Sequence, residues 1–243
     1  MRTLAWNARG LGGPRAIHIL QNLKREMDPE IMFLMETKLG VQALERIRIK
    51  LGYLGKLVVE SVGRSGGLCL FWSDRICADL ISFSRFHIDV KITSSESKLL
   101  RFDWLLWQSR FNTTGPFVDV VTEEGPPRQR RLIEEFREAV DDCELMDIGF
   151  RGPGFTWSNR RDGSAMVQER LDRGFQYLLW HQMFPNSFVQ HLGYWKSDHR
   201  PILVEILTAS DQYLVVGERR RRRFHFEACW ADCEECDVLA SSS

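Results

Sequence analysis

Four places in this chain carry side chains that could together hydrolyse a phosphate ester. They are Asn7, Glu36, Asp172 and the run Ser197-Asp198-His199. Carboxylate oxygens suit Mg²⁺, an ion that keeps several water ligands and contacts substrate phosphate. A histidine can accept a proton from an attacking water, and a neighbouring carboxylate can fix its tautomer. The residue types are therefore those of a metal-dependent hydrolase.

The same residues also have purely structural interpretations. Glu36 alone is typical of an acid at an exposed strand end, and an Asp-His dipeptide alone is typical of a turn. Arg170 and Asp172 could form a cross-strand ion pair. Periodicity does not specify how such residues assemble in space, so the residues alone leave both interpretations open.

The elements expected around the first two candidates are a strand, a helix and a second strand. Residues 3–6 form a short apolar run that ends at Asn7, where a loop rich in glycine and proline begins. Apolar residues at helical spacing predict a helix over 14–27, and residues 31–34 indicate a buried strand ending at 36–38. Each strand therefore delivers polar groups at its end.

The rest of the chain predicts a layered α/β domain. Strands are expected at 56–62, 67–72, 77–83 and 86–92 as an antiparallel meander, whereas residues 99–127 have no clean period. An amphipathic helix is expected over 128–143 and another helix over 177–184. The remaining expected strands are 156–158 and 167–173, which flank a turn at 160–163, and a last strand at 201–207.

Composition fits one intracellular domain. The 243 residues are 44% hydrophobic, enough for a substantial core, and the 33 basic and 33 acidic side chains cancel. No apolar run reaches the roughly 20 residues that span a bilayer, and the amino terminus lacks a signal peptide pattern, so we expect a nuclear or cytoplasmic protein without a membrane partner. The scattered Cys69, Cys77 and Cys143 are expected to be reduced and mostly buried.

Six short motifs occur in an order that resembles a known family. In order they are Trp6-Asn7-Ala8-Arg9-Gly10-Leu11-Gly12, Phe33-Leu34-Met35-Glu36-Thr37-Lys38, Gly66-Gly67-Leu68-Cys69-Leu70-Phe71-Trp72, Gly154-Phe155-Thr156-Trp157-Ser158-Asn159, Glu169-Arg170-Leu171-Asp172-Arg173 and Ser197-Asp198-His199-Arg200-Pro201. From residue 1 to about 206 the chain resembles the endonuclease domain of plant LINE-type (non-LTR) retrotransposons. That domain belongs to the endonuclease/exonuclease/phosphatase superfamily.

The resemblance implies a fold and an activity. The fold would be a four-layer α/β sandwich, deoxyribonuclease I-like, over residues 1–207. The activity would be cleavage of a DNA phosphodiester that depends on Mg²⁺, with Mn²⁺ as a possible substitute and no small-molecule cofactor beyond the metal. The resulting nick would let reverse transcription start from the freed 3′ hydroxyl. By position, Glu36 would bind the metal.

The resemblance also implies roles for the other candidates. Asn7 would orient a metal ligand or the phosphate. His199 would be the base or a phosphate-contacting residue, oriented by Asp198 or a neighbouring acid. Asp172 and Ser197 would support the site. In such a scheme the metal stabilises charge on the phosphate while the activated water attacks in line.

The sequence departs from the family between residues 99 and 127. The family has an aromatic segment with a phosphate-contacting tyrosine, a helix and a Gly-Asp-Phe-Asn motif, and none of these is intact. The nearest remnant is Ser109-Arg110-Phe111-Asn112, in which Asn112 matches the asparagine but Arg110 replaces the aspartate. One preorganised donor can be worth about 10² to 10³ in rate. We therefore expect a missing strand-helix unit and impaired or absent nuclease activity.

The last segment suggests a basic linker at 208–223 and, at 224–243, the truncated start of the segment that leads to a reverse transcriptase. Residues 219–223 are five arginines, typical of a solvated linker or of phosphate contacts. His225, Cys229, Cys233 and Cys236 have a spacing that could hold Zn²⁺, although coincidence in a segment whose apolar positions pack is the favoured explanation. Two alternatives to the nuclease are a noncatalytic nucleic-acid-binding remnant and another phosphoesterase of the superfamily.

Overall fold

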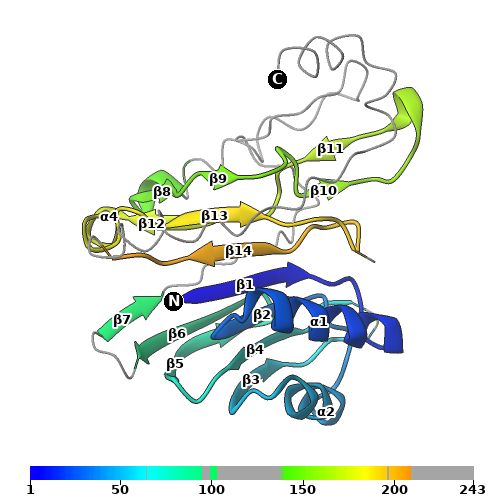
Figure 1. The fold of residues 1–243 in the computed structure, drawn as a ribbon, viewed down its shortest axis with the longest axis horizontal. Coiled ribbons are helices and arrows are strands. Elements are labelled where there is room, and N and C mark those ends of the chain that lie inside the picture. Colours follow the sequence, from blue (N-terminus) through cyan, green and yellow to red (C-terminus); the bar gives the residue numbers. More distant parts are fainter. Residues whose placement is uncertain (64, 95–98, 103–137, 139, 196, 209–243) are drawn as a thin grey trace, which may run out of the picture. The chain divides into compact units, whose positions relative to one another are not determined.

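The computed structural model describes residues 1–63, 65–94, 99–102, 138, 140–195 and 197–208 (Figure 1). In chain order the elements are β1 (Arg2–Asn7), α1 (Pro14–Met27), β2 (Ile31–Met35), α2 (Val41–Leu51), β3 (Gly55–Val59), β4 (Leu68–Trp72), β5 (Ile76–Ser84), β6 (His87–Ser94), β7 (Leu99–Phe102), β8 (Leu145–Asp147), β9 (Phe150–Arg151), β10 (Trp157–Ser158), a 3-10 helix (Gly163–Ala165), β11 (Gln168–Glu169), β12 (Phe175–Tyr177), α4 (Leu178–Met183), β13 (Phe188–His191) and β14 (Ile202–Glu205).

A seven-stranded sheet with the order β3-β4-β2-β1-β14-β13-β9 carries the candidate residues. Strands β1 and β2 are parallel, and Asn7 pairs with Met35. Strand β14 runs antiparallel to β1, with Arg2 opposite Glu205. The carboxyl ends of β1 and β2 and the segment that leads into β14 therefore meet at one edge of the sheet. This edge therefore brings together residues from the first and the last parts of the described chain.

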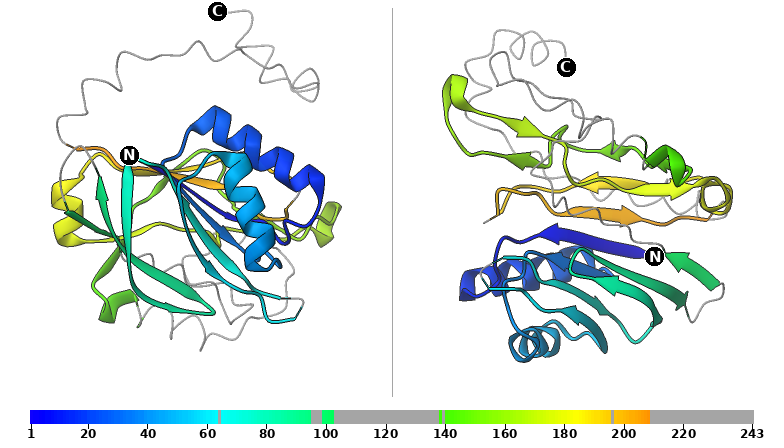
Figure 2. Two further views of the ribbon diagram at one scale, coloured as in Figure 1. Left: turned by 90° about the horizontal axis from the view of Figure 1, so that it is seen from below. Right: turned by 180° about the vertical axis from the view of Figure 1, so that it is seen from behind.

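Apolar side chains cover both faces of this sheet. One face packs against α1 and α2 through a cluster that includes Leu4, Trp6, Leu20 and Leu44 (Figure 2). The other face packs against the three-stranded sheet β5-β6-β7 through a second cluster. Strand β2 is buried at all five positions because it lies between the two clusters. The helices, the seven-stranded sheet and the three-stranded sheet thus form successive layers. This layering agrees with the expected mixed α/β architecture.

Local chemistry explains where the first helix begins and ends. Pro14 stands in the first turn, where its missing N–H is not needed. The helix ends at Asp28, whose φ of 41° is left-handed and whose N–H donates to the Lys24 carbonyl. Ala16, Ile19, Leu20 and Leu23 form its buried face. The predicted bounds, 14–27, are confirmed.

Two predicted strand arrangements are wrong. The expected meander divides between two sheets, because the wholly apolar β4 pairs with β2 and β3 while β5 pairs with β6. The strand expected at 167–173 stops at Glu169, where its partner β10 also ends. Asp172 therefore lies beyond the strand. Helix α2 was not predicted, although Leu44, Ile47 and Leu51 have helical spacing.

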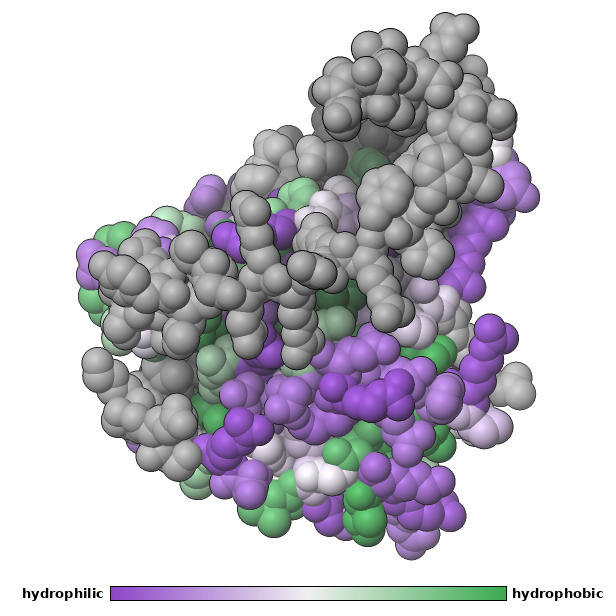
Figure 3. Space-filling view, in the orientation of Figure 1, coloured by the Kyte–Doolittle hydropathy of each residue, from purple (hydrophilic) through white to green (hydrophobic). Residues whose placement is uncertain are grey.

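The cysteine prediction is also partly wrong. Cys69 is buried in β4, whereas the thiols of Cys77 and Cys143 are free and exposed. Cys77 follows the buried Ile76 on β5, so its side chain points to the opposite, solvent-facing side of the three-stranded sheet. Hydrophilic and hydrophobic described residues are intermixed on the face shown in Figure 3, as is usual for protein surfaces.

Several predictions fall outside the described residues. Residues 138 and 140–142 are helical and Cys143 is in a turn, whereas residues 128–137 and 139 of the helix expected over 128–143 lie outside the described part. The same holds for Asn112, for the expected loss of a strand-helix unit after residue 102, and for the linker and tail after 208. None of the described helices is long and apolar enough to cross a bilayer.

Candidate active site

His199 and Asp172 form a buried pair at the centre of the candidate site. Nδ1 of His199 lies 2.8 Å from Oδ2 of Asp172, and the two residues are only 9% and 8% exposed. Burial by itself lowers the pKa of His199, but the nearby carboxylates, Asp172 above all, outweigh burial and raise the pKa above its ordinary value. With Nδ1 bound to the carboxylate, Nε2 is the nitrogen left to exchange a proton with a bound molecule.

Asp198 has different partners. Trp157 Nε1 donates to Asp198 Oδ2 at 2.9 Å, and the Arg9 guanidinium forms an ion pair with the same oxygen. Burial opposes ionisation, yet these two donors and the nearby His199 hold the pKa of Asp198 below its ordinary value. The resemblance offered Asp198 or a neighbouring acid to orient His199, and the acid in contact with the ring is Asp172. The contacts with Arg9 and Trp157 hold the Asp198 carboxylate, whereas the His199 ring turns to Asp172.

Hydrogen bonds join the His199 segment to the end of β1. The Ser197 hydroxyl donates to the Asn7 carbonyl at 2.6 Å and accepts the His199 N–H at 3.1 Å. The indole N–H of Trp6 donates to the His199 carbonyl at 3.1 Å in a buried setting. Residues about 190 positions apart in sequence are therefore held at one place.

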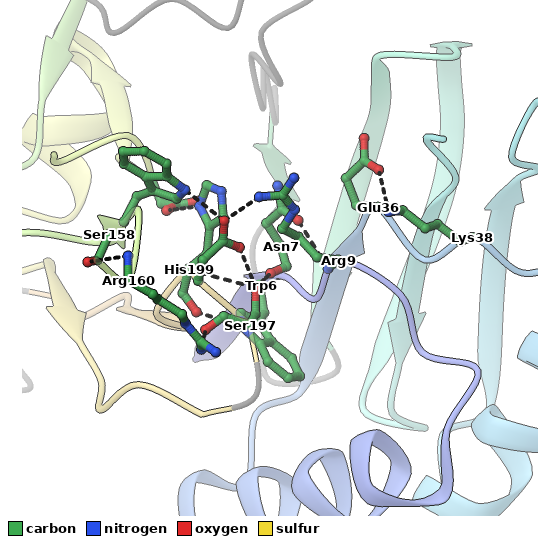
Figure 4. Close-up of polar contacts among 12 residues, drawn as sticks. Trp6, Asn7, Arg9, Glu36, Lys38, Ser158, Arg160, Ser197 and His199 are labelled. Carbon is green, nitrogen blue, oxygen red and sulfur yellow. Dashed lines mark hydrogen bonds and ion pairs between the residues drawn. The ribbon is translucent and has the colours of Figure 1, made fainter. Parts of the chain in front are cut away.

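Asn7 and Glu36 stand at the ends of neighbouring parallel strands. Asn7 is 8% exposed, and its side-chain oxygen accepts the Arg9 N–H at 3.3 Å. Oε2 of Glu36 accepts the Gly66 N–H at 3.1 Å and lies 4.0 Å from the Lys38 ammonium. Figure 4 shows Asn7 and Arg9 between His199 on one side and Glu36 on the other. The structure thus brings all the described candidate residues to the same edge of the sheet.

The donor atoms around Glu36 fit a hydrated Mg²⁺. Glu36 contributes carboxylate oxygens, its side chain is 25% exposed, and the Asn7 amide stands nearby. The described residues hold no group of three or more His, Cys, Asp or Glu arranged around one point. Mg²⁺ in proteins often has only one or two carboxylate ligands and completes its shell with water and substrate phosphate. The residues therefore fit one ion that takes Glu36 as its carboxylate ligand and completes its shell with water.

No family model and no curated protein sequence matches the chain. Solved structures do. The endonuclease domain of TRAS1, a telomere-specific non-LTR retrotransposon, aligns over 84% of this chain and 97% of its own at 13% identity and a TM-score of 0.54. An AP endonuclease from Leishmania major aligns over 85% and 87% at 15% identity and a TM-score of 0.55. A 3′-5′ exonuclease from Neisseria meningitidis aligns over 85% and 100% at 15% and 0.52.

These neighbours are endonuclease/exonuclease/phosphatase-fold proteins. The chain has a deoxyribonuclease I-like fold. The predicted fold class is thereby confirmed, since the helix layer and the two packed sheets agree with it. At these identities the likeness concerns the fold, and the roles of the residues have to be argued from their own chemistry.

Four contacts in this deoxyribonuclease I-like chain were not foreseen. Arg9 and Trp157 lie within the motifs, but their shared acceptor, Asp198, is distant in sequence from both. The structural alternative, an ion pair between Arg170 and Asp172, is not formed, because Arg170 and Arg173 both donate to Asp147, at 2.8 and 2.9 Å. The Asp172 carboxylate is therefore available to pair with His199. In the sequence, only the match of residues 169–173 to a family motif indicated that Asp172 belongs to the site.

Proposed function

We propose that this chain is a DNA phosphodiesterase of the retrotransposon endonuclease type. The carrying observation is the buried His199–Asp172 pair, which stands beside Asn7 at the sheet edge that also presents Glu36. The names of the three similar structures, an endonuclease, an AP endonuclease and an exonuclease, support a nucleic acid as the substrate. Mg²⁺ is the proposed cofactor, with Mn²⁺ as a substitute. Action on genomic DNA would place the protein in the nucleus at that moment.

The chain's own residues would divide the work as follows. Nε2 of His199 accepts the proton of the attacking water, and Asp172 holds the ring by Nδ1 and stabilises the imidazolium that forms. The Asn7 amide and the Arg9 guanidinium orient the phosphate. When bound at Glu36, Mg²⁺ would draw charge from the phosphate oxygens. General base catalysis by a positioned histidine is worth about 10² to 10⁴ in rate.

We further propose that the activity is weak. Arg9 neutralises Asp198, so this carboxylate is engaged before any ion approaches. The Gly-Asp-Phe-Asn motif is not intact in the sequence, and its nearest remnant includes Asn112. Each lost preorganised group can lower the rate by about 10² to 10³.

A second candidate is a DNA-binding protein that does not cleave. The Arg9 side chain favours it, because it is 54% exposed and its guanidinium has N–H donors beyond the one paired with Asp198, which can bind phosphate whether or not cleavage follows. The proposed linker at 208–223, with its five arginines, would add contacts that depend on salt but carry no sequence specificity. In this scheme the nuclease domain, 1–207, would retain its fold for binding alone.

Nicking of supercoiled plasmid by the full chain, with and without Mg²⁺, tests the proposal. Glu36→Gln and His199→Gln remove the two central groups with little change in volume. Glu30→Gln is the matched control, because Glu30 stands before the other end of β2, where its carboxylate accepts the Arg2 N–H.

We expect slow nicking that requires Mg²⁺, survives Glu30→Gln and is lost in both site variants. Nicking that persists in both site variants would trace the activity to another source and refute this site. A folded chain that binds DNA with a steep salt dependence and never nicks would support the binding candidate instead.

A further inference from the structure

Thr156 lies between the segment that carries Asp172 and the segment that carries His199. It is fully buried and directly precedes β10. Its N–H donates to the Glu169 carbonyl at 3.0 Å, and its carbonyl accepts the Arg200 N–H at 2.7 Å. The Thr156 backbone therefore joins β11 on one side to the residue after His199 on the other.

The hydroxyl of Thr156 makes a second set of contacts. Its Oγ1 accepts the N–H groups of Leu171, at 3.0 Å, and Asp172, at 2.9 Å. Both amides lie beyond the end of β11 at Glu169, where the strand pairing with β10 has stopped. A side-chain oxygen thus holds the backbone of Asp172 at a point that no strand reaches.

Neighbouring contacts fasten the His199 side of the junction. The Ser158 N–H donates to the Asp198 carbonyl at 3.1 Å, and Trp157 and His199 form an antiparallel bridge. Among the described residues Asp172 forms no such bridge to β10, so the Thr156 hydroxyl is the contact that ties its backbone to the strand next to His199.

We propose that Thr156 is a positioning residue whose hydroxyl sets the distance between Asp172 and His199. This inference rests on the proposed function, since it assigns Thr156 to the proton transfer of that site. The branched side chain is stiff at χ1, so its oxygen occupies a fixed position. A displacement of about 1 Å at such a pair can lower a rate by about 10²-fold.

The test compares Thr156→Val, which keeps the shape and removes the hydroxyl, with Thr156→Ser, which keeps the hydroxyl. Thr3→Val is the matched control, because Thr3 is also a fully buried threonine in the same domain and its hydroxyl has no hydrogen-bond partner among the described residues. The readout is the pH titration of the His199 imidazole by proton NMR, with His199→Gln for assignment and Asp172→Asn as the limit.

In Thr156→Val we expect the imidazole of His199 to lose about threefold in proton affinity, a downward pKa shift of about 0.5, because Asp172 is no longer held close. Thr156→Ser and Thr3→Val should titrate like the parent chain. A folded Thr156→Val with the parent titration would overturn the proposal. If that variant does not fold, Thr156→Cys, with its weakly accepting sulfur, should give a smaller downward shift, and a parent-like titration there would overturn it equally.

The titration needs no nuclease activity, so it separates this inference from the proposed function. A chain that never nicks DNA but shows the expected shift would keep the positioning role and refute only the catalytic use. If nicking is measurable, Thr156→Val should lower kcat by about 10-fold or more. It should leave KM nearly unchanged, and Thr156→Ser should restore kcat.

Discussion

Replacing Asp172 with asparagine should destabilise the protein more at low pH than at high pH. Burial lowers the pKa of His199, but the nearby carboxylates raise it by more. The net result is a folded-state pKa above the ordinary 6.5. A raised folded pKa means that the protonated ring stabilises the fold fully below about pH 6.5. This stabilisation is lost as the pH rises through the folded pKa. Asp172→Asn removes the main source of that stabilisation.

The geometry sets the magnitude. A hydrogen bond between two charged groups contributes about 1.5–3 kcal/mol, and Asp172 lies 2.8 Å from the ring nitrogen with both groups buried. Asp172→Asn should therefore lower the free energy of unfolding by about 1.5–3 kcal/mol at pH 5.5. Near pH 9 only the hydrogen bond is weakened, and the loss should be about 1 kcal/mol.

Urea unfolding at pH 5.5, 7 and 9 measures these differences. Asp28→Asn is a suitable control, because Asp28 forms an exposed ion pair with Lys24 and has a left-handed backbone that asparagine tolerates. Its pKa is lowered, chiefly by the hydrogen bond from Lys24, so its effect should be below about 1 kcal/mol and flat across this range. An equal loss in Asp172→Asn at all three pH values would refute the charge pairing.

Three other substitutions test the framework of the site. Trp6→Phe leaves the buried His199 carbonyl without its indole donor and should cost about 2–4 kcal/mol in urea unfolding, whereas a change below about 0.5 kcal/mol would contradict the bond. Tyr53→Phe removes the buried hydroxyl that donates to the Pro29 carbonyl at 2.9 Å, and calorimetry should show a loss of about 1 kcal/mol. Gly67→Ala introduces a Cβ at a φ of 89° and 2.5 Å from a buried hydroxyl. It should lower stability by about 1–3 kcal/mol, and an unchanged melting temperature would show that the loop adjusts freely.

The sequence by itself determined the strands that carry the first half of the site. Apolar runs that stop at polar residues predicted β1, β2 and α1, and hence the strand-end positions of Asn7 and Glu36. These features depend on local periodicity and on the conformational preferences of proline and glycine, which neighbouring residues express together. The mixed α/β class followed from the order of such elements.

Only the tertiary structure decided which side chains pair. Asp172, rather than the adjacent Asp198, contacts His199, because Asp198 pairs with Arg9 from the other end of the chain. Strand β4 pairs with β2 instead of with β5, which a strand pattern alone does not reveal. Local periodicity fixes which face of an element is buried. The pairing of Asp172 with His199, 27 positions apart, and of Arg9 with Asp198, 189 positions apart, depends instead on how whole elements pack and on which polar groups then lack other partners.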